Sequence, residues 1–326
     1  METYIREWFE IIENMKNSNT YKLAWGRSIL DIAISGGYSI DNNQAVFQVS
    51  LIAEKMIKYY WDQTYYFNLK QGPINKQPVL LTHVQELIQY YKEKTGNINP
   101  IWYNKAEQTL KEDTKYFNKV ISKAVKIINQ DVAWRFPNAN DFEIYKLEPA
   151  DKPIKKLLIT SQDDAKILSD YGVLLMQLIN YKWVQLLELY NRSPRIASKI
   201  SGFDRGQIDR KNLAKYKAIL LRQFKNRNVI DFYTGKVLQE NEISVDHVIP
   251  WSFMYSDDIW NLVITSKSNN SSKLNKIPSS NYIEKLKEQA LALKNILQEE
   301  KNSYYNELEE AINNNYIDKF YLDSKQ

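Results

Sequence analysis

The residues best suited to chemistry lie in the last third of the chain, where His247, one of only two histidines, directly follows Asp246. A neutral imidazole has an ordinary pKa of about 6.5, so it can take a proton from water at neutral pH. Asp246 and the downstream Asn261 and Asn270 supply carboxylate and amide oxygens, which suit a hard cation such as Mg²⁺. These groups match the needs of phosphodiester hydrolysis, which are an activated water, charge neutralisation at phosphorus and help for the leaving oxygen.

An aspartate–histidine pair by itself is usually structural or solvated, so the residues around it decide its meaning. In order, the sequence has a turn at residues 233–236, a strand that ends at Val245, Asp246-His247, Pro250, Ser252, Asn261-Leu262-Val263, Asn270, Lys273 and Pro278. This frame resembles the HNH, or ββα-metal, endonuclease family. It closely resembles the cysteine-free HNH domain of RNA-guided CRISPR effector nucleases, whose pattern runs DHxxPxSF and then N, N, K and P. The resemblance covers about 50 residues, about 15% of the chain.

The resemblance implies a role for each matching side chain. His247 corresponds to the general base, and Asp246 and Asn270 correspond to the two residues that hold Mg²⁺, for which Mn²⁺ can substitute. Asn261 corresponds to the asparagine that orients the histidine and ties the two arms of the motif together. Lys273 corresponds to a basic residue that steadies phosphate charge near the scissile strand. Asn269, one position before Asn270, is the alternative metal ligand.

The chain contains no cysteine, which excludes a disulfide framework and a cysteine-ligated zinc. Many members of the resembled family clamp the motif with four cysteines around zinc, so we expect packing to replace a structural zinc. The expected packing residues are Phe232, Tyr233, Val245, Val248, Ile249, Phe253, Leu262 and Val263. At 326 residues the sequence also has no room for the guide-binding lobes of the large effector nucleases, so we expect no RNA guide.

Positive charge is concentrated just before the motif. Between Asn191 and Asn228 there are eleven basic and two acidic residues, whereas the whole chain has a net charge of only +5. Such a run is commonly a solvated helix face, but its place before this motif favours contact with nucleic-acid phosphates. The residues assigned to nucleic-acid binding are Arg210, Lys215, Arg222, Lys225, Arg227 and Lys273. We expect a basic helix over about 208–226 that presents Arg222, Lys225 and Arg227 as one exposed stripe.

The remaining sequence predicts mainly helices. Apolar residues recur at helical spacing through most of the first 130 residues, and Asn19 and Thr20 are candidate caps for a helix that starts at Tyr21. Further helices are expected over 43–62, 80–91, 106–129 and 162–190, and short strands over 142–147 and 154–159. Short β-like runs begin at Val229, and two amphipathic helices are expected after Pro278.

These elements predict a mainly α protein with a small α+β element. We expect a helical N-terminal domain over 1–195, which serves DNA recognition or partner binding. An HNH nuclease domain over 196–326 would hold the basic lead-in helix, a motif core at 229–280 and the C-terminal helices. The apolar stretch Tyr171–Leu189 is interrupted by five amide or charged residues, so it predicts a buried helix and no membrane span. With no signal peptide and no cysteine, the expected location is the cytoplasm.

The leading hypothesis is a Mg²⁺-dependent endonuclease that cuts DNA and leaves 5′-phosphate and 3′-hydroxyl ends, as the resembled family does. Stand-alone bacterial proteins of this build commonly act in restriction or anti-phage defence. The segment SNTYKLAW at residues 18–25 resembles such proteins but assigns no residue roles. One active centre per chain implies nicking by a monomer or a double-strand break by a homodimer. Three alternatives stay open: activity only within a multi-protein complex, a decayed module that binds DNA without cutting it, and RNA as substrate.

Overall fold

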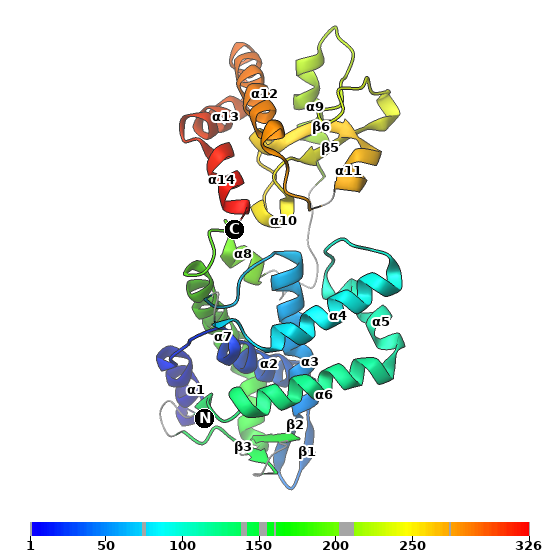
Figure 1. Cartoon of the computed structure of the whole chain (residues 1–326). Helices are drawn as coiled ribbons and strands as arrows, with labels where there is room; N and C mark the ends of the chain where they lie inside the picture. Colours follow the sequence, from blue (N-terminus) through cyan, green and yellow to red (C-terminus); the bar gives the residue numbers. More distant parts are fainter. Residues whose placement is uncertain are drawn as a thin grey trace. The chain divides into compact units, whose positions relative to one another are not determined.

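The computed structural model describes residues 2–73, 76–137, 142–149, 155–159, 161–201, 212–273 and 275–325 (Figure 1). Within these residues, fourteen α-helices and six short strands confirm the expected mainly α fold with a small β component. The chain divides into two compact units. The N-terminal unit is Met1–Asn191 with Ile196–Gly206, and the C-terminal unit is Arg192–Arg195 with Gln207–Gln326.

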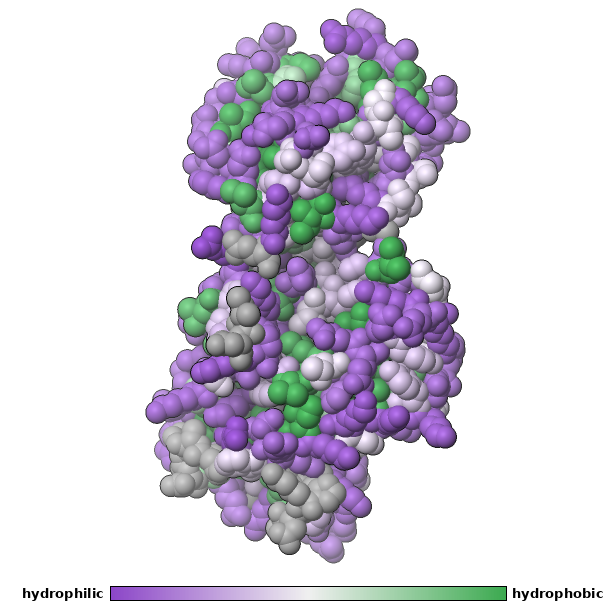
Figure 2. Space-filling model, in the orientation of Figure 1, coloured by the Kyte–Doolittle hydropathy of each residue, from purple (hydrophilic) through white to green (hydrophobic). Residues whose placement is uncertain are grey.

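The N-terminal unit is mainly helical. Its helices are α1 (Glu2–Asn14), α2 (Tyr21–Ser35), α3 (Val49–Tyr60), a π-helical turn (Trp61–Tyr66), α4 (Leu80–Thr95), α5 (Tyr103–Glu112), α6 (Thr114–Asp131), α7 (Gln162–Glu188) and α8 (Ile196–Ser201). Helix α2 is apolar on nearly all sides, which is typical of a helix that other elements surround. In the described part of the chain, no helix is both long and apolar enough to cross a membrane. Hydrophilic residues cover most of the face that Figure 2 shows, with hydrophobic residues scattered among them.

Helices α2 and α7 pack closely because glycines lie where the two helices meet their neighbours. A Cβ atom at Gly26 would lie 2.7 Å from the ring of Phe136 and 3.1 Å from Ile179 Cδ1. A Cβ atom at Gly172 would lie 3.0 Å from Ile34 Cγ1. Since both distances are shorter than ordinary van der Waals contact, a side chain at either position would separate the packed surfaces.

A four-stranded antiparallel sheet corrects the prediction of one continuous helix over 43–62. Its order is β1 (Ser39–Asp41), β2 (Gln44–Gln48), β4 (Lys156–Ile159) and β3 (Tyr145–Glu148). Strands β1 and β2 are joined by Asn42 and Asn43, whose φ angles of 46° and 62° fit a two-residue hairpin turn. The helix therefore begins only at Val49. Strands β3 and β4 confirm the two strands expected in this region, with bounds shifted by a few residues.

The C-terminal unit contains the motif. Its elements are α9 (Ala214–Leu220), a 3₁₀ turn (Leu221–Phe224), a second 3₁₀ turn (Glu240–Glu242), β5 (Ile243–His247), α10 (Trp251–Met254), a third 3₁₀ turn (Ile259–Asn261), β6 (Leu262–Ser266), α11 (Lys267–Lys273), α12 (Ser280–Glu299), α13 (Tyr304–Asn313) and α14 (Tyr316–Ser324). Strands β5 and β6 pair antiparallel, with Asp246 opposite Val263 and His247 opposite Leu262. With α11, the pair forms a ββα arrangement.

Three helices follow Pro278, so the prediction of two was wrong. Helix α12 ends at Glu299, and Lys301 then adopts a left-handed φ of 53°. Asn315, with a φ of 54°, separates α13 from α14 in the same way. Left-handed residues interrupt the amphipathic pattern without breaking its apolar spacing. The spacing alone therefore could not reveal the second break.

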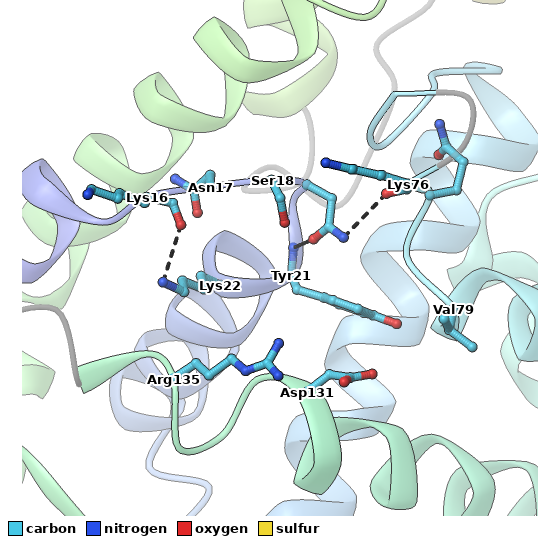
Figure 3. Close-up of a pocket in the computed structure, with 11 residues that line it drawn as sticks. Lys16, Asn17, Ser18, Tyr21, Lys22, Lys76, Val79, Asp131 and Arg135 are labelled. Atoms are coloured by element: carbon cyan, nitrogen blue, oxygen red, sulfur yellow. Dashed lines mark hydrogen bonds between the residues drawn. The ribbon is translucent and has the colours of Figure 1, made fainter.

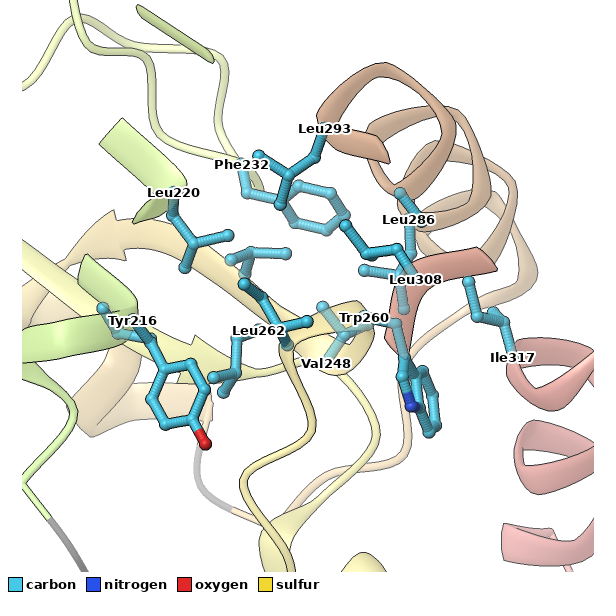
Figure 4. Close-up of a cluster of buried hydrophobic side chains, with 14 of the residues drawn as sticks. Tyr216, Leu220, Phe232, Val248, Trp260, Leu262, Leu286, Leu293, Leu308 and Ile317 are labelled. Carbon is cyan, nitrogen blue, oxygen red and sulfur yellow. The ribbon is translucent and has the colours of Figure 1, made fainter. Parts of the chain in front are cut away.

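The core of the C-terminal unit surrounds the β5–β6 pair. Figure 4 shows Tyr216 and Leu220 of α9, Leu262 of β6 and Leu293 of α12 among the side chains that converge on it. Six of the eight predicted packing residues are buried in this cluster, and Tyr233 and Phe253 are partly buried against it. The packing prediction is therefore confirmed. Truncating one of the buried aliphatic residues to alanine would cost about 2–5 kcal/mol.

Candidate active site

Asp246 lies at the end of β5 and is nearly buried, with 7% of its surface exposed. Its Oδ2 accepts a hydrogen bond of 2.5 Å from the hydroxyl of Tyr233 and lies 2.9 Å from Nζ of Lys273. Burial and the charge of Asp246 raise the pKa of Tyr233 above its ordinary value, so the hydroxyl keeps its proton and remains a donor. Tyr233 was expected only as a packing residue, and its hydroxyl belongs to the site.

His247 follows Asp246 and contacts a second carboxylate. Its Nε2 lies 3.0 Å from Oδ1 of Asp257, which also accepts a 3.1 Å hydrogen bond from Nε1 of Trp251. The imidazole and this carboxylate are both largely buried, with 12% and 14% of their side chains exposed. An ionised carboxylate only accepts, so Nε2 is the donor in this contact, and in the neutral imidazole Nδ1 then carries the lone pair.

Asn261 holds the loop that follows His247 in place through hydrogen bonds to the backbone. It is fully buried, its Oδ1 accepts from the backbone nitrogen of Ile249 at 2.8 Å, and its Nδ2 donates to the carbonyl of Ile249 at 2.9 Å. Its own carbonyl accepts from Val248 at 2.9 Å. Both ends of the amide are therefore engaged with backbone. Asn261 acts through the loop as a positioning residue.

Helix α11 places Asn270 beside β5. The Nδ2 of Asn270 donates to Ser244 Oγ at 2.9 Å and to the carbonyl of Val245 at 3.0 Å. Because its nitrogen faces the strand, its Oδ1 is the atom that can ligate a cation. Asn269 has a different partner, since its Nδ2 donates to Oδ2 of Asp231 at 2.8 Å. The two neighbouring asparagines thus belong to different clusters.

Asp231 holds the turn before β5 against the end of β6. It is fully buried, and its Oδ1 accepts from the backbone nitrogens of Tyr233 and Thr234, both at 2.9 Å. Its Oδ2 accepts from Thr265, Ser266 and Asn269 at 2.7–2.9 Å. Burial alone would raise the pKa of Asp231, but these hydrogen bonds outweigh it and lower the pKa to about 2. Asp231 was missed, although an aspartate before a turn is a recognisable sequence signal.

Lys273, the last residue of α11, contacts both Asp246 and His247. Its Nζ contacts Oδ2 of Asp246, donates to the carbonyl of His247, and lies 5.4 Å from the ring centroid of Tyr233. Only 12% of its side chain is exposed. Burial lowers the pKa of Lys273, and the neighbouring charge of Asp246 opposes that shift. The ammonium group is thus held where negative charge is already present.

The donor set decides which cation the site could accept. Within the residues that the structure describes, no group of three or more His, Cys, Asp or Glu side chains could hold a metal ion. Asp246 and Asn270 offer one carboxylate and one amide oxygen. Mg²⁺ is commonly held by one or two carboxylates together with waters and phosphate oxygens. These two hard oxygen donors therefore fit Mg²⁺, whereas they do not resemble a structural zinc site.

The predicted basic helix is shorter than expected. Helix α9 ends at Leu220 and its 3₁₀ continuation ends at Phe224, so Lys225 and Arg227 lie beyond both. Asn226 between them has a left-handed φ of 62°, which a right-handed helix cannot contain. The prediction of a single helical stripe was therefore wrong. The start of the predicted helix lies outside the described residues.

The members of the basic set have different surroundings. Arg222 forms an ion pair with Glu300, and the Lys215 ammonium lies 4.6 Å from the ring centroid of Tyr216. Lys215, Lys225 and Arg227 are exposed. Arg210 lies outside the described residues. Among those that the structure describes, Lys273 alone of this set shares a hydrogen bond or ion pair with Asp246 or His247.

Family models match a part of each unit. The family model described as HNH endonuclease matches residues 231–279, which include every side chain of the site, so the C-terminal unit carries an HNH endonuclease domain. No curated protein and no solved structure gave a significant match. A second family model, described as domain of unknown function DUF8808, matches residues 5–201, more than half of the chain. The chain therefore belongs to the DUF8808 family and combines that domain with an HNH endonuclease domain.

Proposed function

We propose that the protein is a metal-dependent endonuclease that hydrolyses DNA phosphodiester bonds, with His247 as the general base. The observation that carries this proposal is the contact between His247 Nε2 and Asp257 at 3.0 Å, next to the Asp246–Lys273 pair at 2.9 Å. One residue of β5 thus offers a proton acceptor while its neighbour offers a carboxylate. The HNH match over 231–279 supports the same reaction class.

Neighbouring residues fix the tautomer and the orientation of His247. Asp257 keeps the proton of His247 on Nε2, so Nδ1 can accept a proton from the attacking water. As the proton arrives, the imidazole becomes positive and its attraction to the Asp257 carboxylate strengthens. Asn261 holds the backbone of Ile249, two residues after His247, and so limits movement of the imidazole. These contacts orient the base before substrate arrives.

Asp246 and Asn270 are the proposed Mg²⁺ ligands. When bound, Mg²⁺ would neutralise charge at the scissile phosphate and assist the leaving oxygen. Tyr233 donates to Oδ2 of Asp246 and fixes the carboxylate on one side. Lys273, next to the same oxygen, supplies positive charge to a phosphate that approaches the carboxylate.

The proposed biological setting is restriction or another anti-phage defence, as expected for stand-alone HNH nucleases with a helical N-terminal region.

The sharpest test of the activity is plasmid cleavage by the purified full chain in Mg²⁺, in Mn²⁺ and in EDTA. We expect nicking or linearisation with either metal and none in EDTA. His247→Ala should lose at least about 100-fold in rate while its melting temperature and DNA affinity stay close to those of the wild type.

Two outcomes would count against the proposal. Cleavage by His247→Ala at the wild-type rate would exclude His247 as the base. Cleavage in EDTA at the rate seen in Mg²⁺ would exclude the metal. If the purified chain alone does not cut plasmid, the same assay with a cell extract that lacks the protein tests activity within a complex.

A further inference from the structure

The N-terminal unit contains a pocket that is separate from the HNH domain. It has a volume of about 270 Å³ and lies where α2 begins, next to the segment 16–19, the residues 76–79 and the end of α6 (Figure 3). The motif SNTYKLAW, residues 18–25, contributes Ser18, Asn19, Tyr21 and Lys22 to its lining. That motif has no role in the active site described above.

The pocket lining is strongly positive. The lining contains four cations, Lys16, Lys22, Lys76 and Arg135, and one carboxylate, Asp131. Lys16, Lys76 and Arg135 are exposed, and Lys22 is half-buried. Among the described residues, no ion pair joins any of these four cations to a carboxylate. Some lysines of the same unit are paired, as Lys55 is with Asp31 at 2.8 Å and Lys182 is with Glu13 at 2.5 Å. The pocket therefore concentrates cations whose charge the protein itself does not neutralise.

The charged form of Lys22 is disfavoured in this pocket. It is half-buried, and its Nζ donates to the backbone carbonyl of Lys16 at 3.2 Å. Burial, together with the positive charge of Arg135, lowers the pKa of Lys22. In Figure 3, Lys22 extends toward the backbone of Lys16, and Arg135 extends toward Asp131 from a different segment. Arg135 is close enough to affect the pKa of Lys22, so an anion near both would interact favourably with both cations.

The start of α2 adds to this preference. The helix has fifteen residues, Thr20 makes no side-chain cap hydrogen bond, and its first turn contains no acidic residue. Asn19 satisfies one backbone donor, since its Oδ1 accepts from Tyr21 at 3.1 Å. The remaining donors and the positive end of the helix dipole favour an anion at this end.

We propose that this pocket binds a phosphate monoester, carried either by a free nucleotide or by a 5′-phosphorylated DNA end. A phosphate monoester has a charge of about −1.5 to −2 at pH 7, which suits four cations and one carboxylate better than the single charge of a diester does. The volume suits one phosphate and part of its sugar or base. The proposal does not depend on the nuclease activity, because its residues lie in the N-terminal unit.

Isothermal titration of the full chain in EDTA, in which metal-dependent cleavage is blocked, tests the proposal. The probes are deoxyadenosine 5′-monophosphate, deoxyadenosine, and one duplex oligonucleotide with either a 5′-phosphate or a 5′-hydroxyl. We expect at least one phosphorylated probe to bind about tenfold or more tightly than its unphosphorylated counterpart. Preference for the mononucleotide identifies a free nucleotide as the source, and preference for the phosphorylated duplex identifies a DNA end.

Variants distinguish binding in the pocket from a general effect of the protein's positive charge. Lys22→Gln/Arg135→Gln should weaken the preferred probe about tenfold or more, whereas Lys119→Gln/Lys166→Gln, which removes the same charge from exposed positions on α6 and α7, should not. Lys16→Gln/Lys76→Gln serves as the second pocket variant if the first does not fold. Equal binding of phosphorylated and unphosphorylated probes, no binding of any probe, or equal affinity in pocket and control variants would overturn the proposal.

Discussion

A carboxylate that accepts from Nε2 of His247 fixes both the tautomer and the orientation of the imidazole. Asp257→Asn should therefore lower kcat about 100-fold while KM for DNA changes little, because the contact acts on the base and not on substrate. The neighbouring Asp258 provides a matched control, since its described partners are Ser256 and Arg195. Steady-state cleavage by Asp257→Asn and Asp258→Asn measures the difference. Equal losses of kcat in the two variants would mean that kcat depends on local negative charge and not on the orientation of the imidazole.

The separate partners of Asn269 and Asn270 allow two adjacent, chemically identical substitutions to be compared. Asn270→Ala removes a proposed metal ligand, so the Mn²⁺ affinity measured by isothermal titration should fall about tenfold or more, with little loss of stability. Asn269→Ala removes a hydrogen bond to the ionised Asp231, so it should cost about 1.5–3 kcal/mol of unfolding free energy and leave Mn²⁺ affinity unchanged. The opposite pattern would make Asn269 the ligand.

At the residue scale, the sequence identified Asp246, His247, Asn261, Asn270 and Lys273 because their spacing matches a family frame. It did not identify Asp257 as the partner of His247, since that contact depends on how the loop of residues 248–258 folds back. The hydroxyl of Tyr233 was missed for a similar reason. A partly buried aromatic residue predicts packing, and only the structure reveals that its polar end meets a carboxylate.

At the scale of elements, the carboxylate of Asp231 links the turn before β5 to the end of β6 by hydrogen bonds. The stability that these hydrogen bonds contribute should therefore depend on pH. The pKa of Asp231 is about 2 in the folded protein, below the value of about 3.9 expected in an unfolded chain. The unfolded chain therefore takes up protons first as pH falls. The stabilisation, about 2 kcal/mol, is present above about pH 5 and is lost progressively as pH falls towards 2.

Urea unfolding of the wild type and Asp231→Asn at pH 7, 5 and 3 tests this stabilisation by Asp231. The variant should be less stable by about 2 kcal/mol at pH 7, and the difference should shrink at pH 3. Asp323→Asn, at a half-buried position in the last turn of α14, is a suitable control. A difference that stays constant across this pH range would show that the charge of Asp231 does not contribute.

Element types were predicted well where apolar periodicity extended over many residues, as in α7. The single helix expected over 106–129 is divided at Asp113 into α5 and α6. The prediction failed at β2, where Val46 and Phe47 fit either a helix or a short strand. Asn42 and Asn43 were the signal that could have decided it, because adjacent asparagines tolerate left-handed backbone. The basic helix failed similarly, since Lys225 and Arg227 carry charge but no apolar pattern that would define a helix end.

At the scale of the whole molecule, the chain joins two units that carry positive charge for different proposed purposes. In the N-terminal unit, the cations line an open pocket beside a single acid. In the C-terminal unit, Lys225 and Arg227 lie on an exposed turn that follows α9 and leads to the HNH domain. Charge totals in the sequence could locate the second region but not the first, whose cations come from four separate segments.

The exposed turn should contribute to DNA binding through phosphates. Since each phosphate contact contributes about 0.9 to the slope of log affinity against log salt, Lys225→Gln/Arg227→Gln should flatten that slope by up to about 2. Arg222→Gln should change it less, because Arg222 is already paired with Glu300. Lys119→Gln/Lys166→Gln again controls for net charge. Fluorescence anisotropy with a labelled duplex in EDTA, between about 50 and 200 mM salt, measures all four proteins. An unchanged slope in Lys225→Gln/Arg227→Gln would make this turn a solvated surface and shift DNA contact to other residues.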